Sequence, residues 1–353
     1  MWSKIKHLVK KESGNSIVMV ALSLGALLSM TGLVIDGGTM YVTKSHLQKT
    51  ANAAALSGAQ ELTNKEDEVR RVAKEVLERH GESESLENIK VQMEDRVDVF
   101  LTKPVDLNFV GIFGIEQADV KVYAAAEILP MNESTGMAPF SVPNNVPIRS
   151  PEDPEYDESE DIHTIKFKPG NDKDDAEVDK EGSTSDYGIL SYEYTYVDTN
   201  DPETCCTEKD EHYPEGGSGN DRYRHDFKYG SESWIEIGDV VGVETGQNNK
   251  GTMEAMDYRW ENCPYKDGSV EDPWKYRDCT RVILLPRTED ANTKTGTNKK
   301  YRVTGFAYFF IIEPYNNGKK EIKGHFVEKA DTGYGRDGDK TENSGAFAIR
   351  LTE

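Results

Sequence analysis

The sequence is poor in the residues from which catalytic and metal centres are built. It has 4 cysteines and 7 histidines among 353 residues, with no H-E-x-x-H motif and no closely spaced C-x-x-C pair. Neither a zinc-protease helix nor a zinc knuckle is therefore indicated. The segment Gly216–Asn220 departs from the G-x-S-x-G nucleophile elbow at its last position, and no strand-like run precedes it. The sequence predicts no catalytic residue, no cofactor site, no metal site and hence no enzyme.

Basic residues are fewer than acidic residues. The chain has 42 Lys and Arg against 64 Asp and Glu, a net charge of −22. Such a chain repels phosphate backbones, which excludes nucleic acid as a partner. Disorder is excluded by the aromatic residues, because 17 Tyr, 11 Phe and 4 Trp are enough to build packed cores.

The run Ile17–Ile35 lacks charge altogether. At about 1.5 Å per residue it matches most of a hydrocarbon layer of roughly 30 Å. Lysines dominate residues 1–16, which predicts a cytoplasmic N-terminus, a single transmembrane helix over 17–35 and an extracellular remainder at the cell membrane. The alternative is a cleaved signal peptide. However, the run is longer than the usual apolar region, and no small-x-small cleavage site follows promptly.

Proline is absent from the stretch that follows this span, so the helix is expected to continue beyond the membrane as one rod to Leu62. Small residues recur on one side of it at helical spacing, inside and outside the span, and predict faces that other helices or sheets approach closely. Asp36 lies at the outer edge, where its carboxylate either meets headgroups, a neighbouring helix or a partner's amine, or simply marks the end of the span. The predicted packing residues are Ala21, Gly25, Ser29, Gly32, Asp36, Leu47, Ala51, Ala54 and Gly58.

Residues 36–130 are expected to form the outer part of this rod and a small α+β unit. Thr63–Glu66 has the form of a capping box, and Gly81 is a plausible helix stop, so a second helix is predicted between them. Leu107–Phe113 predicts a short apolar turn or helix. The predicted strands are Ile89–Met93, Val97–Leu101 and Val120–Leu129.

The rest of the chain divides into a linker with an acidic insertion, 131–186, and a β-rich region, 187–353. No helical pattern interrupts the second part, so we expect a sandwich or partly open barrel and an α+β fold overall. Its predicted strands are Gly188–Val197, Ser233–Val243, Arg281–Leu285, Tyr301–Ile312, Glu321–Val327 and Ala346–Leu351.

The four cysteines, Cys205, Cys206, Cys263 and Cys279, all lie on the predicted outside, where disulfides persist. A bond between the adjacent pair would be strained. We therefore expect two bridges, one from each of Cys205 and Cys206 to Cys263 or Cys279. A four-thiolate zinc site and free or intermolecular thiols are the alternatives.

Three acidic loops could offer oxygen ligands to Ca²⁺, although solvated loops are the simpler interpretation. Asp157–Asp161 approximates the D-x-S-x-S metal loop of adhesion domains but lacks its last Ser and the preceding apolar strand. Asn171–Asp175 and Asp337–Asp339 lack the frame of an EF-hand.

Gly32–Leu62 closely resembles the N-terminal region of the TadE/TadG-like proteins of the Flp (tight-adherence) pilus system. The features that carry the resemblance are an Asp with a nearby Gly, a Tyr, a Leu-Gln pair and an Ala-rich run ending in Gly-Ala. These are Asp36, Gly38, Tyr41, Leu47-Gln48 and Ala51–Ala59. Weaker likeness to extracellular domains that follow this region extends over Met137–Pro143, Ile235–Gly246, Cys279–Arg287 and Val303–Ile311.

The resemblance implies a non-enzymatic pilus-assembly or minor-pilin-like protein of the envelope, with other Tad/Flp components as partners through helix packing. It does not extend to prepilin processing, because the fifth position after Gly14 is Met19, where processed pilins have Glu. The alternative function is a membrane-tethered extracellular module that binds wall polymer or Ca²⁺ without a role in pili. A tethered hydrolase ranks third, because no nucleophile or acid/base pair is indicated.

Overall fold

A computed structural model describes residues 13–149, 161–166, 190–196, 219–243, 249–265, 279–291, 300–315, 321–331, 333–335 and 345–352. Its architecture is a long N-terminal helix followed by mixed α/β structure with two sheets, one of them a half-barrel. The predicted α+β class is confirmed.

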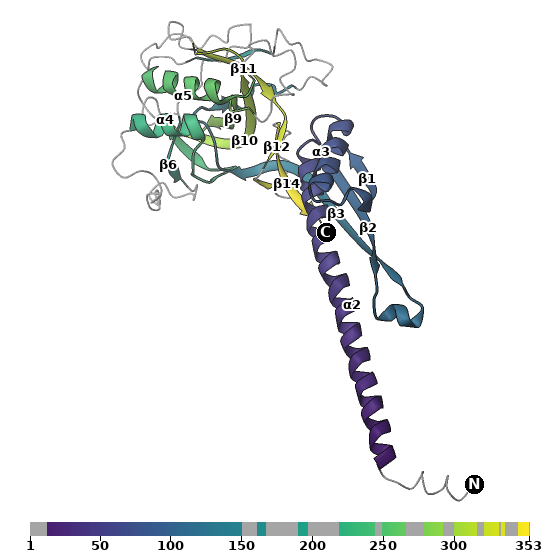
Figure 1. Cartoon of the computed structure of the whole chain (residues 1–353). Coiled ribbons are helices and arrows are strands. Elements are labelled where there is room, and N and C mark those ends of the chain that lie inside the picture. The colour runs from purple at the N-terminus through teal and green to yellow at the C-terminus, as the bar shows by residue number, and fades with distance from the viewer. Residues whose placement is uncertain are drawn as a thin grey trace, which may run out of the picture.

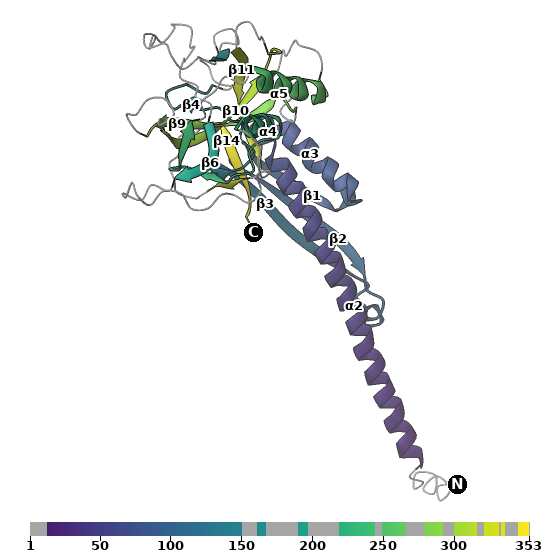
Figure 2. The same ribbon diagram turned by 90° about the vertical axis from the view of Figure 1, so that its left-hand side faces the viewer.

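The N-terminal helix α2 runs without interruption over Ser13–Ala59. It continues through Asp36, Gly37 and Gly38, where the sequence contains the only cluster of glycines in this region. Figures 1 and 2 show its N-terminal half projecting alone from the folded part, while its C-terminal half lies against a sheet. The prediction that the helix continues past the apolar span is confirmed.

The first sheet begins with three antiparallel strands. These are β1 (Leu86–Gln92), β2 (Arg96–Asp106) and β3 (Gln117–Ser134). A short 3-10 turn, η1 (Ser83–Ser85), precedes β1, and a second, η2 (Val110–Phe113), closes the long β2–β3 hairpin before Gly114, whose φ of 89° favours glycine. The predicted strands and the short apolar helix are all present. Their alternation of apolar and polar residues fits a sheet with one face against a helix.

Helix α3 (Glu66–Arg79) packs on the same side of the sheet as α2 and buries Val69, Ala73 and Leu77. Its start differs from the prediction, because Lys65 is the N-cap residue and makes no side-chain capping bond. The hydroxyl of Thr63 donates instead to the carbonyl of Glu328, at 3.3 Å. The predicted capping box is therefore wrong: a distant strand end competes for its hydroxyl. The stop at Gly81 is confirmed by its φ of 70°.

Strands from much later in the chain complete the first sheet. β14 (Ala346–Thr352) pairs antiparallel with β3, matching Ile349 with Ile128, and β12 (Lys329–Asp331) pairs parallel with β14. The short strands β13 (Tyr334–Gly335) and β7 (Ile235–Glu236) also pair with β3. The last strand predicted for the 187–353 region thus belongs to the sheet that covers α2.

The second sheet is built on β10 (Lys300–Ile311), which pairs antiparallel with three neighbours. Its aromatic run from Phe306 to Phe310 is buried on both faces. The order is β4-β9-β10-β11-β5, with β6 and β8 attached through β10. The other strands are β4 (Val142–Pro143), β5 (His163–Lys166), β6 (Leu190–Tyr196), β8 (Val240–Val243), β9 (Val282–Asp290) and β11 (Glu321–Val327).

Two helices interrupt the β-rich region, contrary to the expectation that it had no helical pattern. They are α4 (Gly219–Tyr229) and α5 (Asn249–Asn262), which lie together over the second sheet (Figure 1). The apolar residues that α4 buries are the aromatic residues Tyr223 and Phe227, a residue type that is also enriched in strands, and Asp226 is buried beside them. α5 buries the polar residues Thr252 and Arg259 beside Ala255 and Met256. Its buried face therefore lacks the apolar spacing by which a helix is recognised in a sequence.

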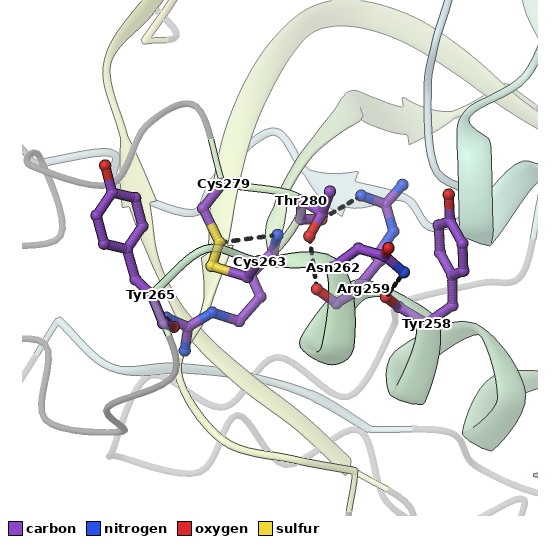
Figure 3. The surroundings of a disulfide bond; sticks show 8 residues. Tyr258, Arg259, Asn262, Cys263, Tyr265, Cys279 and Thr280 are labelled. Atoms are coloured by element: carbon purple, nitrogen blue, oxygen red, sulfur yellow. Dashed lines mark hydrogen bonds between the residues drawn. A yellow bond between two sulfur atoms is a disulfide. The ribbon is translucent and has the colours of Figure 1, made fainter.

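The disulfide pairing also corrects the sequence analysis. Cys263, just after α5, is bonded to Cys279, just before β9, with the two Cα atoms 5.0 Å apart (Figure 3). Bridges from Cys205 and Cys206 to these two residues are therefore wrong, while Cys205 and Cys206 lie outside the described residues. Hydrogen bonds between Thr280 and Arg259 join the same two segments and bring the cysteines together.

Candidate functional site

The N-terminal half of α2 is an exposed apolar surface. Its large side chains from Ile17 to Ile35 are 45–73% exposed, although they are the most hydrophobic run in the chain. Within the described residues, α2 is the one helix that is long and apolar enough to cross a membrane. An apolar surface of this length is stable in water only when something else covers it.

The small residues Ala21, Gly25 and Ser29 lie on one face of this exposed segment. A Cβ atom added at Gly25 would meet nothing within 4 Å, so this face is open in the isolated chain. The hydroxyl of Ser29 donates to the carbonyl of Gly25 at 2.8 Å, which satisfies it within the helix. The face is thus smooth and internally satisfied, as close helix packing in lipid requires.

Gly32 and Asp36 continue the same face, but the tip of the β2–β3 hairpin covers them. A Cβ atom at Gly32 would lie 2.6 Å from the side chain of Phe109, so only glycine allows this approach. Both residues are buried. The predicted small-residue face is therefore divided into an open part, Ala21 to Ser29, and a part occupied by the chain itself.

The carboxylate of Asp36 is held by the backbone of the hairpin tip. It accepts the N–H groups of Asn108, Phe109 and Val110 at 3.0, 2.9 and 2.7 Å. Three donors converging on one carboxylate stabilise its charge where water is largely excluded. Asp36 is thus a structural anchor between helix and hairpin, a role that the sequence did not indicate.

The outer stripe of α2 faces the chain's own structure. Leu47, Ala51 and Ala54 are fully buried in the core formed with the first sheet, and Gly58 lies against Val69 and Ala73 of α3. The sequence predicts that another helix or sheet approaches this stripe closely, and within this chain the first sheet and α3 make that approach.

Gln48 is a residue whose role the sequence did not reveal. Its amide Nε2 donates to the carbonyl of Tyr123 on β3 at 2.8 Å and to Asn52 Oδ1 at 2.9 Å. Together with Leu47, it fixes the rotation of the helix on the sheet. The Leu-Gln pair and the Ala-rich run of the resemblance are thus the residues that join α2 to this sheet.

An ionic cluster around the buried carboxylate of Glu82 lies where α2, α3 and β2 meet. Glu82 accepts hydrogen bonds from Lys103 Nζ at 2.6 Å and Ser85 Oγ at 2.5 Å, and His46 Nε2 lies 3.4 Å away. Burial alone would raise the pKa of Glu82, but these hydrogen bonds and the charge of Lys103 lower it overall. With its carboxylate satisfied in this way, Glu82 is a structural residue rather than a general base.

Within the described residues, no group of three or more His, Cys, Asp or Glu side chains is arranged to hold a metal ion. The acidic loops Asn171–Asp175 and Asp337–Asp339 lie outside the described residues, as does nearly all of Asp157–Asp161. The absence of a metal, a cofactor and a catalytic site therefore stays a prediction. What the described geometry supports is association, through the open apolar face of α2.

Comparison with protein families gives one match. Residues 14–61 match a family described as "Putative Flp pilus-assembly TadE/G-like". No curated protein and no solved structure matches the chain. The matched segment is helix α2 with the two residues that follow it, so the match covers both the exposed apolar half and the half packed on the first sheet.

Proposed function

We propose that this chain, which carries a TadE/G-like domain over residues 14–61, is a non-enzymatic, membrane-anchored component of a Tad/Flp pilus, acting in assembly or as a minor pilin. Residues 17–35 cross the cell membrane once, with the N-terminus inside. The two sheets are exposed outside, and neighbouring pilus components dock on the helix within the membrane.

One observation carries this proposal: the two halves of α2 differ completely in their surroundings. The outer half packs on this chain's own sheet from Leu47 onward, whereas the apolar inner half is exposed among the described residues except at Gly32 and Asp36, which the hairpin tip covers. A folded domain on one end of a bare apolar helix needs a bilayer, other helices or both. The family match supplies the kind of assembly in which such helices meet.

The open face at Ala21, Gly25 and Ser29 is the proposed docking surface. In lipid the hydrophobic effect does not favour contact between helices, because the acyl chains are themselves apolar. Helix association therefore depends on close packing of the two backbones, which small side chains permit. Leu47, Ala51, Ala54 and Gly58 support docking indirectly, by holding the folded unit on the helix. Gly32 and Asp36 limit the surface at its outer end.

The test replaces Gly25 and Ser29 together by leucine (Gly25→Leu, Ser29→Leu) in piliated cells. We expect the protein to reach the membrane at normal levels but to lose co-purification with pilus components, together with piliation. Normal association and piliation in this variant would refute the docking surface.

A matched control substitutes Ser23→Leu and Thr31→Leu, which lie on the other side of the helix. Thr31, like Ser29, donates its hydroxyl to the carbonyl four residues earlier, so both variants remove one such bond. The control should retain association. Equal loss in both variants would indicate a general effect of added bulk.

Exposed aromatic residues favour a second candidate, the tethered binding module. Tyr229, Trp234 and Tyr265 are 59%, 52% and 41% exposed in the region of the second sheet, and aromatic faces are a common contact for sugar polymers. Binding of the purified protein to isolated cell wall, abolished by Trp234→Ala, together with normal piliation in a deletion strain, would favour this alternative.

A further inference from the structure

The tip of the β2–β3 hairpin is an uncharged, apolar loop. Residues 107–115 contain no charged side chain and are bounded by Asp106 and Glu116. Ile112 and Ile115 are 80% and 53% exposed, and Phe109 is 39% exposed even though it packs against Gly32. Isoleucines at the end of a hairpin in a chain this acidic need an apolar environment.

The tip lies beside the apolar part of α2, as Figures 1 and 2 show by the course of the hairpin along the helix. Phe109 contacts Gly32, which lies one helical turn, about 6 Å, before Asp36 along the axis. The apolar run ends at Ile35. The tip is therefore level with the outer end of the segment that we expect to be in lipid.

Hydrogen bonds within the chain satisfy most of the amide groups of the tip. Asp36 accepts those of Asn108, Phe109 and Val110. The N–H groups of Leu107, Ile112 and Gly114 donate to the carbonyls of Glu116, Phe109 and Gly111. Such internal pairing is what backbone in a membrane requires, because each amide left without a partner in lipid costs several kcal/mol.

We propose that residues 107–115 insert into the outer leaflet of the bilayer as a second membrane contact beside α2, with Ile112 and Ile115 among the acyl chains. Asp106 and Glu116 remain at the headgroups and set the depth. The occupant of this surface is lipid, because the loop continues the exposed apolar surface of α2 at the same level. The inference rests on α2 crossing the membrane and not on the proposed role in pili.

The helix and the tip together then fix the orientation of the folded unit. A helix alone leaves the unit free to rotate about the axis and to tilt relative to the membrane. A second contact, held on α2 through Asp36, restricts both motions. The open face of Ala21, Gly25 and Ser29 lies on the same side of α2 as the tip, so this contact also restricts the direction from which a neighbouring helix approaches.

The experiment places the photoreactive residue p-benzoylphenylalanine, one position per variant, at Ile112 or Ile115 of the full chain in phosphatidylcholine vesicles. Position Val34, exposed on the apolar segment of α2, is the control for membrane crossing. Position Tyr229, an aromatic site at the end of α4 that is 59% exposed, close to the 53% of Ile115, is the control for non-specific labelling. After irradiation, mass spectrometry of the tryptic peptides measures the lipid adduct at each position.

We expect lipid adducts at positions 112 and 115 in yields comparable with that at position 34, and only background at position 229. An adduct at 34 with background at both 112 and 115 overturns tip insertion while α2 still crosses the membrane. Background at 34 overturns the membrane span itself. In native membranes, crosslinks from 112 and 115 to another protein in place of lipid would assign the tip to a subunit interface and refute the proposal.

Discussion

The N–H of Val110 donates to the carboxylate of Asp36 at 2.7 Å, across 74 positions of sequence. This bond and its two neighbours connect the tip of a hairpin to α2 directly after the uncharged run that ends at Ile35. The relationship explains why a carboxylate directly follows an uncharged span. It serves the chain's own fold, and the charge is matched by backbone dipoles instead of by a cation.

Replacing this carboxylate by an amide (Asp36→Asn) is expected to loosen the hairpin tip. A hydrogen bond to a charged group contributes about 1.5–3 kcal/mol, and an amide retains at most part of the three bonds. Hydrogen exchange at the amides of 108–110 should accelerate by roughly tenfold or more, since about 1.4 kcal/mol corresponds to a factor of ten. Asp95→Asn, at an exposed turn, should leave this exchange unchanged; equal protection in both variants would contradict the anchoring role.

Gly32 and Gly25 form a matched pair for the effect of added side chains. A Cβ atom at Gly32 would lie 2.6 Å from Phe109, whereas at Gly25 it would meet nothing within 4 Å. Gly32→Val should displace the hairpin tip, at a cost of about 1–3 kcal/mol, and Gly25→Val should not. Thermolysin cleavage between residues 107 and 116 in detergent micelles should be faster in Gly32→Val than in Gly25→Val, and equal cleavage of the two variants would be incompatible with this contact.

The disulfide gives a prediction about stability and a check on its pairing. Cys263 and Cys279 are 16 positions apart, and closing a loop of this size contributes about 3 kcal/mol in the chain-entropy account. The double variant Cys263→Ala, Cys279→Ala should lose about that much unfolding free energy in urea. Peptide mapping without reduction should recover one linked pair containing Cys263 and Cys279; linkage of either to Cys205 or Cys206 would disprove the assignment.

The buried imidazole of His163 makes the second sheet sensitive to acid. Burial lowers the pKa of His163 to about 4, although Asp161 nearby acts in the opposite direction and His325 and Arg149 reinforce the burial. In the unfolded chain the imidazole of His163 has its ordinary pKa near 6.5. Between about pH 4 and pH 6.5 it therefore binds a proton in the unfolded chain but not in the folded chain. The contribution of His163 to the free energy of unfolding is fully present above about pH 6.5. It falls by up to roughly 3 kcal/mol as the pH decreases towards 4.

Thermal unfolding in detergent at several values of pH between 4 and 7.5 tests this sign. His163→Phe should flatten the decrease in stability, because the aromatic contact with Phe326 remains possible while the titrating group is gone. His80→Gln, at an exposed position, should retain the dependence of the wild-type chain. A decrease that His163→Phe leaves unchanged would assign the acid sensitivity to other groups.

Local patterns in the sequence were sufficient for the elements nearest the N-terminus. Helix α2 follows from small and apolar residues at helical spacing without proline, and the β1–β2 hairpin follows from two short apolar runs around a polar turn. Even η2 at the hairpin tip was indicated by the run Leu107–Phe113 and its terminal glycine. In these segments each residue's neighbours along the chain determine its conformation.

Contacts between distant segments account for the errors. The hydroxyl of Thr63 bonds a carbonyl 265 positions away instead of capping α3. The partner of Cys263 follows from the positions of α5 and β9, which the sequence did not reveal because α5 was itself missed. The partners of Asp36 belong to a loop whose proximity depends on the length of the β2–β3 hairpin. In each of these three cases the bonding partner is determined by the tertiary structure, and the spacing of residues along the chain does not reveal it.

The pairing of β14 with β3 has a consequence for the order in which the fold is completed. During synthesis β1 to β3 follow α2 directly and can pair at once. The edge of β3 at residues 125–130 stays unsatisfied until residues 346–352 arrive. The sheet that packs on α2, although its first three strands are synthesised early, is thus completed last, and the edge of β3 has to be kept from pairing with other chains throughout the synthesis of the second sheet.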